Sequence, residues 1–136
     1  ETHAGTAACS PGLAWNICRE FDPRELGVIL DIAHFHREGE VAPSLTVSIL
    51  RDHIDCIHIG GSRREKNARD EFGCALVTKE FCDLKDADSY VPAWISALKA
   101  ANVQAPLLIE DYEPNVPSEV RIRRCAELLR QLDGKV

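Results

Sequence analysis

Short, mostly apolar segments that each end on a polar residue constrain the fold of this chain most. Residues 26–30, 54–57 and 106–109 are such segments, and they are followed by Asp31, His58 and Glu110. Runs of about five residues rich in Val, Ile and Leu are typical of strands buried on both faces, as a parallel sheet requires. Because the carboxyl ends of parallel strands converge on one face, these polar side chains are expected to meet there. Glu1 is expected to end a further strand.

Segments with helical periodicity separate the predicted strands. Apolar residues recur at helical spacing within 13–21, 45–50, 91–101 and 122–132. The clearest stripe consists of Val91, Trp94, Ile95, Leu98 and Ala101. Asp86 or Asp88 is its candidate N-cap and Asn102 lies at its end, while the last stripe lies between Ser118 and Gly134. Strand and helix therefore alternate four times, which predicts α/β units around a parallel sheet.

The segment from Gly60 to about Lys85 is rich in charge and is predicted to be the one long loop. Trp15 and Trp94 lie on helical stripes and are predicted to pack in the core or at an interface. The six cysteines are Cys9, Cys18, Cys56, Cys74, Cys82 and Cys125. They form no CxxC pair and several lie in apolar stripes, which predicts reduced thiols and a cytoplasmic protein.

Charge and hydropathy exclude two classes of partner. The net charge is −6 and the basic residues are mixed with acidic ones, whereas a nucleic-acid surface needs clustered Lys and Arg. No apolar stretch approaches the roughly 20 residues of a membrane span, and no signal peptide is visible. The 136 residues are enough for a single domain with its own core. We expect neither nucleic acid nor membrane as a partner.

Three carboxylates and one imidazole at the strand ends indicate a divalent cation site. This set contains many oxygen ligands and no thiolate, which favours Mn²⁺, Mg²⁺ or Co²⁺ over structural Zn²⁺. With a divalent cation bound, the three carboxylates would leave about one net negative charge, and the site would still admit a neutral polyol. A cation that chelates a carbonyl and its neighbouring hydroxyl acidifies the adjacent C–H and stabilises an enediolate.

Four segments together resemble the C-terminal half of the xylose isomerase-like TIM barrels. They are residues 1–6 (ETHAGT), 31–34 (DIAH), 58–64 (HIGGSRR) and 109–110 (IE). This superfamily includes sugar phosphate isomerases and epimerases, ketose 3-epimerases, inosose dehydratases and the apurinic endonuclease IV group. The resemblance covers residues 1–136 as a single segment, from the end of the fifth strand through the eighth helix of a (β/α)8 TIM barrel.

The resemblance implies a role for each matching residue. The implied metal ligands are Glu1, Asp31, His58 and Glu110, and the two glutamates form the implied acid/base pair. His34 and Arg64 are implied to bind substrate, with Arg64 chosen over Arg63 by spacing. His3 alternates with Glu1 and is a further candidate for substrate binding. His36 and His53 are expected at the surface.

The function that the resemblance implies is a metal-dependent sugar or polyol isomerase or epimerase acting through an enediolate. A related dehydratase of inosose or dehydroshikimate type begins with the same proton abstraction and stays open. A non-catalytic binding or interaction half-barrel is a third reading. The endonuclease reading is disfavoured, because that group carries an Asp-x-His pair after the position of His58 and this chain has no histidine there.

Two features predict that the chain is a fragment. It contains no methionine, and four βα units are half of the eight that close a barrel of about 250 residues. An isolated half would leave strand edges unpaired. We therefore expect the missing N-terminal half-barrel as a partner, an inactive isolated chain, and self-association as a homo-oligomer.

Overall fold

The computed structural model describes residues 1–3, 5–37, 42–69, 71–73, 75–87 and 91–133. Their elements are, in order, α1 (Pro11–Cys18), β1 (Val28–Asp31), α2 (Ile32–Arg37), α3 (Pro43–Leu50), η1 (Arg51–His53), β2 (Ile54–Ile59), β3 (Ser62–Arg69), β4 (Ala75–Phe81), η2 (Leu84–Asp86), α4 (Val91–Ala100), β5 (Leu107–Ile109) and α5 (Ser118–Asp133). Among these residues, no helix is both long and apolar enough to cross a membrane.

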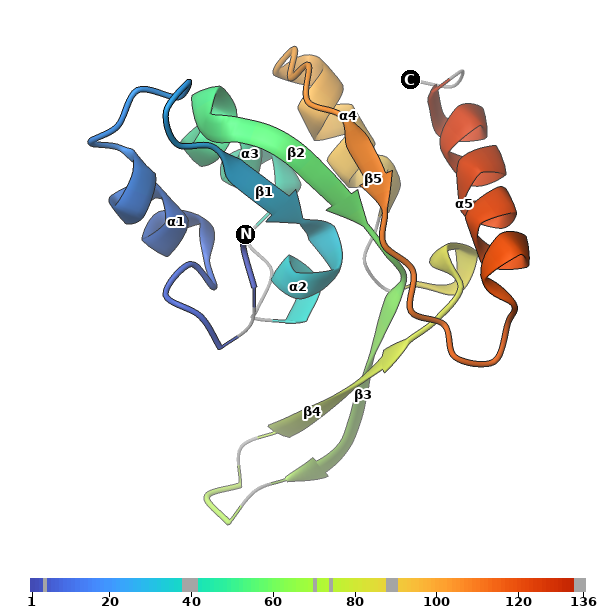
Figure 1. The fold of residues 1–136 in the computed structure, drawn as a ribbon. Helices are drawn as coiled ribbons and strands as arrows, with labels where there is room; N and C mark the ends of the chain where they lie inside the picture. The colour runs from blue at the N-terminus through green and yellow to red at the C-terminus, as the bar shows by residue number, and fades with distance from the viewer. Residues whose placement is uncertain (4, 38–41, 70, 74, 88–90, 134–136) are drawn as a thin grey trace.

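Strands β1, β2 and β5 form a parallel sheet in that spatial order (Figure 1). The three strands predicted before Asp31, His58 and Glu110 are therefore present and parallel, although β1 begins at Val28 rather than at Leu26. Asp31 is paired with His58, and His58 is paired with Leu108. This register places the ends of all three strands at one edge of the sheet.

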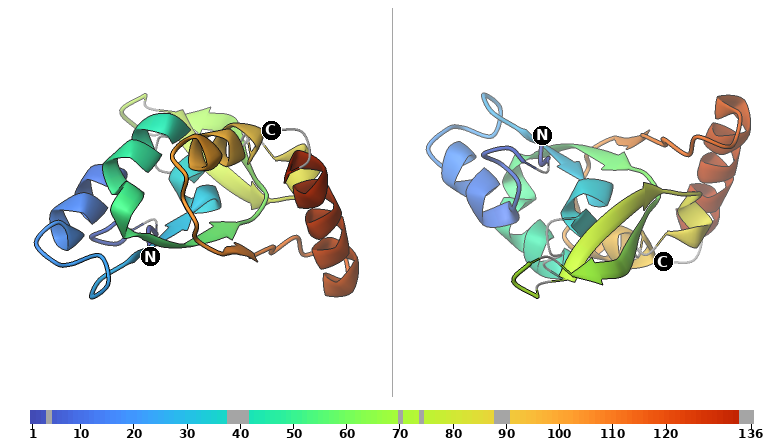
Figure 2. Two further views of the ribbon diagram at one scale, coloured as in Figure 1. Left: turned by 90° about the horizontal axis from the view of Figure 1, so that it is seen from above. Right: turned by 90° about the horizontal axis from the view of Figure 1, so that it is seen from below.

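The two faces of this sheet differ in burial. Leu30, Ile57 and Ile59 point to one face, where they are at most 2% exposed. Helices α3 and α4 cover this face (Figure 2). The opposite face carries Asp31 and His58, and on it Leu108 is 51% exposed. Successive strand residues alternate between faces, so the polar strand ends share the face that the helices leave open.

The helix predicted around residues 91–101 is confirmed as α4, with Val91, Trp94, Ile95 and Leu98 buried. Asp86 belongs to η2 and does not cap α4, and Asp88 lies outside the described residues. The predicted first helix is α1, which begins after Ser10, whose side chain accepts a hydrogen bond from Leu13 N.

The apolar stripe of the first predicted helix faces solvent. Leu13, Ile17 and Phe21 are 45–50% exposed, whereas Ala14 and Cys18 are buried against the core. The small residues of α1 therefore lie on its buried face, and the larger apolar residues do not. Trp15 is half-exposed and makes an edge contact with His53, while Trp94 is fully buried.

The prediction of one long loop between Gly60 and Lys85 is wrong. Strands β3 and β4 form an antiparallel hairpin that extends away from the sheet (Figure 1), followed by η2. The strands were not predicted because this segment is rich in charged residues and lacks an apolar strand pattern. Such a pattern is not required in a projecting hairpin, whose two faces can both be polar. Gly73, with φ of +80°, supplies the left-handed conformation in the connection between the strands.

Two histidines expected at the surface are buried. His53 is 5% exposed and its Nδ1 lies 3.0 Å from Leu26 O, and His36 is 6% exposed. His36 follows Phe35 in α2, which packs against β2, whereas His53 ends η1 and contacts the backbone before β1. Among the described residues, no disulfide bond is formed by Cys9, Cys18, Cys56, Cys82 or Cys125.

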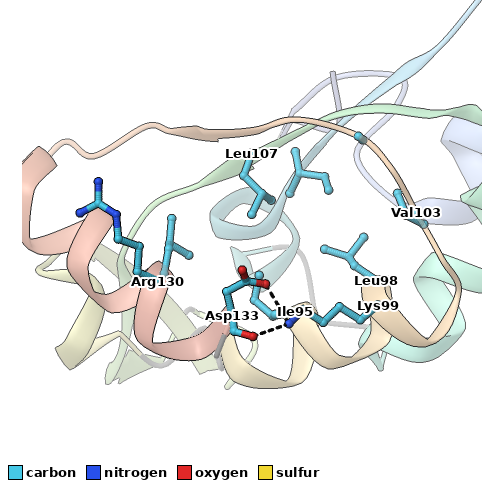
Figure 3. A pocket seen from close by; sticks show the side chains of 10 residues that line it. Ile95, Leu98, Lys99, Val103, Leu107, Arg130 and Asp133 are labelled. Atoms are coloured by element: carbon cyan, nitrogen blue, oxygen red, sulfur yellow. Dashed lines mark hydrogen bonds and ion pairs between the residues drawn. The ribbon is translucent and has the colours of Figure 1, made fainter. Parts of the chain in front are cut away.

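An apolar cavity of about 370 Å³ lies between the strands and helices α4 and α5 (Figure 3). Ile95, Leu98 and Leu107 line it. Lys99 and Asp133 form an ion pair of 2.9 Å that joins the two helices beside it. The cavity is on the helix-covered face, so it is separated by the sheet from the polar strand ends.

Candidate metal centre

The structure brings together the four residues predicted as metal ligands. One potential ligand atom from each of Glu1, Asp31, His58 and Glu110 lies within 4.8 Å of every other. His58 Nδ1 is 2.7 Å from Glu110 Oε2, 3.7 Å from Glu1 Oε1 and 3.9 Å from Asp31 Oδ2. The imidazole is thus surrounded by carboxylate oxygens that come from three other segments of the chain.

Backbone register positions three of these residues. Asp31 and His58 are direct partners across β1 and β2, so their side chains project from the same face. Glu110 N donates to Ile59 O at 2.9 Å, which aligns Glu110 with the end of β2. The close approach of Glu110 to the end of β2 requires a glycine directly after Ile59, since a Cβ on Gly60 would lie 2.2 Å from Glu110 O.

Thr2 anchors the fourth residue, Glu1. Thr2 is 1% exposed, and its backbone N donates to Ile29 O at 3.0 Å along the outer edge of β1. Its hydroxyl also accepts a hydrogen bond of 2.9 Å from Asp31 N. These bonds hold the neighbouring Glu1 beside Asp31 although residues 1–3 do not form a strand of their own.

The carboxylates perturb one another. Burial raises the pKa of Asp31 to about 6; the backbone hydrogen bond from His34 opposes this rise and the charges of Glu110 and Glu1 add to it. Burial also raises the pKa of Glu110, but the hydrogen bond from Tyr112 and the charge of His58 outweigh it and lower the pKa. Like charges held this close in a partly buried site are stabilised by a cation.

The imidazole of His58 fits a ligand role. Its Nδ1 is buried and has no partner with hydrogen-bond geometry, despite its short distance to Glu110. A buried nitrogen without a directed hydrogen bond is destabilising unless another group satisfies it. Opposite ligands of Mg²⁺ lie about 4.2 Å apart, so small shifts within the 4.8 Å cluster would accommodate such an ion. The donor set of three oxygens and one nitrogen therefore suits a divalent cation.

Two of the three residues predicted to bind substrate lie at this cluster. His34 Nε2 is 4.0 Å from Asp31 Oδ2, and its backbone N donates to Asp31 Oδ1 at 2.7 Å. The ring of His3 lies on that of His34, with 3.8 Å between the ring centroids. Arg64 is in β3, where its backbone pairs with Lys79, and its side chain lies outside the described part of the chain.

Tyr112 was not predicted from the sequence. Its hydroxyl donates a short hydrogen bond to Glu110 Oε1, while Glu110 Oε2 faces His58. The same bond raises the pKa of the Tyr112 phenol. The sequence did contain a signal for this contact. Tyr112 lies two residues after Glu110 in an extended segment, where residues i and i+2 project to the same side.

Asp111 and Glu113 stabilise the loop that follows Glu110. Asp111 Oδ1 accepts from Glu113 N at 2.9 Å, and Arg121 of α5 donates to the backbone oxygen of Asp111. Cys125 Sγ lies 3.5 Å from Asp111 Oδ2, and burial raises the pKa of this thiol to about 12. Cys125 is therefore a packing residue and not a nucleophile.

Comparisons with known proteins agree with the fold described above. The model of the family described as "Xylose isomerase-like TIM barrel" matches residues 1–132. The chain is similar to the crystal structure of a xylose isomerase domain protein from Planctomyces limnophilus, with a TM-score of 0.66 and 18% sequence identity. The match covers 92% of this chain and 43% of that one, and at this identity it shows the fold alone. No curated protein matches the sequence significantly.

Proposed function

We propose that this chain, which belongs to the xylose isomerase-like TIM barrel family, carries the metal centre and the acid/base pair of a divalent-metal-dependent sugar or polyol isomerase or epimerase. One observation carries the proposal: four potential ligand atoms from four segments meet within 4.8 Å at the carboxyl ends of parallel strands. In TIM barrels this end of the strands is where catalytic residues are placed.

Glu1, Asp31, His58 and Glu110 would hold the ion. A bound Mn²⁺, Mg²⁺ or Co²⁺ would polarise a substrate carbonyl and make the neighbouring C–H more acidic. The ligand set favours these ions over structural Zn²⁺, because it contains three carboxylates and no thiolate.

The two glutamates are the proposed acid and base. The pKa of Glu110 is lowered, which favours its ionised form, and its Oε1 accepts a hydrogen bond from the exposed phenol of Tyr112. Glu1 comes from the opposite side of the cluster, beyond β1, so the two carboxylates can approach a substrate carbon from different directions. One would remove the proton and the other would deliver one, as an epimerase requires. His34, His3 and Arg64 are the proposed contacts to substrate hydroxyls.

We further propose that turnover requires four more βα units on the open side of the sheet. The chain spans 43% of the solved structure that it resembles, and Leu108 is half-exposed on the face that carries the cluster. Catalytic groups lose much of their effect when displaced by about an ångström, so an incompletely enclosed site is expected to be slow.

Two measurements test the proposal. Isothermal titration of the chain with Mn²⁺, Mg²⁺ and Co²⁺ at pH 7.5 should show one ion bound per chain. A protein with the complete barrel should then convert a ketose or keto-inositol when that ion is added. Absence of stoichiometric binding would exclude the metal centre. Binding without conversion of any of these substrates would favour a non-catalytic binding domain, and loss of water from the substrate would identify a dehydratase.

A further inference from the structure

A polar cavity of about 600 Å³ lies next to the metal centre, between the base of the β3–β4 hairpin and the loop after β5. Its walls include Arg63, Phe81, Asp83, Asp86, Tyr112 and Arg124. The volume is within the range of about 300–1,000 Å³ that is typical of small-molecule sites. Tyr112 lines this cavity and also donates a hydrogen bond to Glu110, so it forms the boundary between the cavity and the cluster.

The charges on the cavity wall compensate one another. Arg124 Nη1 lies 3.1 Å from Asp83 Oδ2, and Arg63 Nη2 donates to Asp86 O at 3.4 Å. Lys85 also lies 3.8 Å from a carboxylate oxygen of Asp86. A phosphate or carboxylate ligand would need an excess of cationic donors. The wall instead offers donors and acceptors side by side, which suits the hydroxyl groups of an uncharged molecule.

Two aromatic rings are exposed in this polar setting. Phe81 is 41% exposed and Tyr112 is 53% exposed, with 5.1 Å between their ring centroids and 53° between their planes. Ring faces that stay open next to polar groups provide apolar area for the C–H groups of a carbohydrate, whose hydroxyls can bond at the ring edges. Aromatic and polar groups thus select the same class of ligand.

We propose that this cavity binds the end of a polyhydroxylated substrate that is remote from the metal centre, with Phe81 and Tyr112 as the apolar platform. The assignment of substrate ends rests on the proposed function, because the metal centre defines the reacting end. The cavity would make the protein selective for longer uncharged polyols over three-carbon ones. Arg63 would then contact substrate hydroxyls from the side of β3.

Saturation-transfer NMR with sorbitol as the probe tests this proposal. The chain is kept free of metal with EDTA, so the result does not depend on the metal centre. Saturation of the aromatic protons should transfer to sorbitol and only weakly to glycerol. Phe81→Leu keeps an apolar side chain but removes the ring, and it should weaken sorbitol binding about three- to tenfold.

Phe72→Ala is the matched control, because it removes a ring that is 82% exposed between β3 and β4, outside the cavity. It should leave sorbitol binding unchanged, and circular dichroism should show that both variants are folded. Lack of transfer to sorbitol, or equal effects of Phe81→Leu and Phe72→Ala, would overturn the proposal. Failure of the metal titration would instead reject the proposed function while the sorbitol result stands by itself.

Discussion

The ionisation of Asp31 depends strongly on its surroundings. Its side chain is buried and its pKa is about 6, above the ordinary value of 3.8. The folded state therefore binds this proton more tightly than the unfolded state. The resulting stabilisation is present below about pH 4 and is lost as the pH rises through 6, by roughly 3 kcal/mol for this group.

We predict that Asp31→Asn removes this pH dependence. Without divalent ions, the wild-type chain should lose stability relative to Asp31→Asn between about pH 4 and 6.5, as measured by urea unfolding at several pH values. Addition of Mg²⁺ should stabilise the wild type more at pH 7 than at pH 5, because the ion competes with the proton. A constant difference between the two proteins over this range would refute the raised pKa.

Glu110 has two proposed roles, as a metal ligand and as an acid/base group. Glu110→Gln keeps the shape of the side chain but removes its charge. We predict that it weakens binding of Mn²⁺ to the chain and lowers turnover by the complete barrel by about 10²–10⁴-fold. Titration calorimetry and a substrate assay measure the two effects.

Glu113→Gln is the control for this prediction. Glu113 is three residues away, and its Oε1 accepts a hydrogen bond from Asn115 N outside the cluster. A glutamine oxygen can accept the same bond, so metal binding should be unchanged. Equal losses in both variants would point to a general effect of charge and not to a role for Glu110.

At the scale of elements, the end of β2 and the end of β5 are held together by a close backbone contact. Gly60 leaves no room for a Cβ, since Glu110 O would lie 2.2 Å from it. We predict that Gly60→Ala destabilises the fold by about 1–3 kcal/mol and also weakens metal binding, because the strand ends must separate. Thermal unfolding and a Mn²⁺ titration measure this.

Gly12→Ala separates this steric effect from the general effect of replacing glycine. Gly12 is in α1, and nothing lies within 4 Å of the position of its Cβ. Alanine there should stabilise the helix by roughly 0.5–1 kcal/mol and leave metal binding unchanged. If Gly60→Ala behaves like Gly12→Ala, the contact does not position Glu110.

For the whole molecule, the open face of the sheet predicts self-association. Leu108 is 51% exposed in β5, for which the described residues provide a strand partner on one side alone, namely β2. Unpaired edges and exposed apolar faces favour contact between copies. We expect the chain to associate as its concentration rises, and Leu108→Gln to shift sedimentation velocity towards the monomer.

The exposed apolar residues of α1 are an alternative surface for association between copies. Leu13 and Ile17 are each 45% exposed on α1, which is not part of the sheet. Leu13→Gln should leave association unchanged if the copies meet through β5. A larger effect of Leu13→Gln than of Leu108→Gln would place the interface on α1 instead.

The local sequence was sufficient to predict the three parallel strands, helix α4 and three of the four residues of the cluster. Apolar runs identify buried strands, and in a parallel sheet the polar residue that ends each run must lie at the same edge as the others. Asp31, His58 and Glu110 could therefore be grouped before any contact was known. Family resemblance and residue alternation added His34 and His3, which lie beside Asp31.

Only the tertiary structure decided features that depend on contacts between distant segments. The hairpin of β3 and β4 was not predicted, because its residues are mostly charged or polar and show no apolar strand pattern. Burial of His36 and His53, and the outward face of Leu13 on α1, follow from how helices pack on the sheet. Periodicity defines the faces of a helix or strand, but which face becomes buried depends on what the rest of the chain places against it.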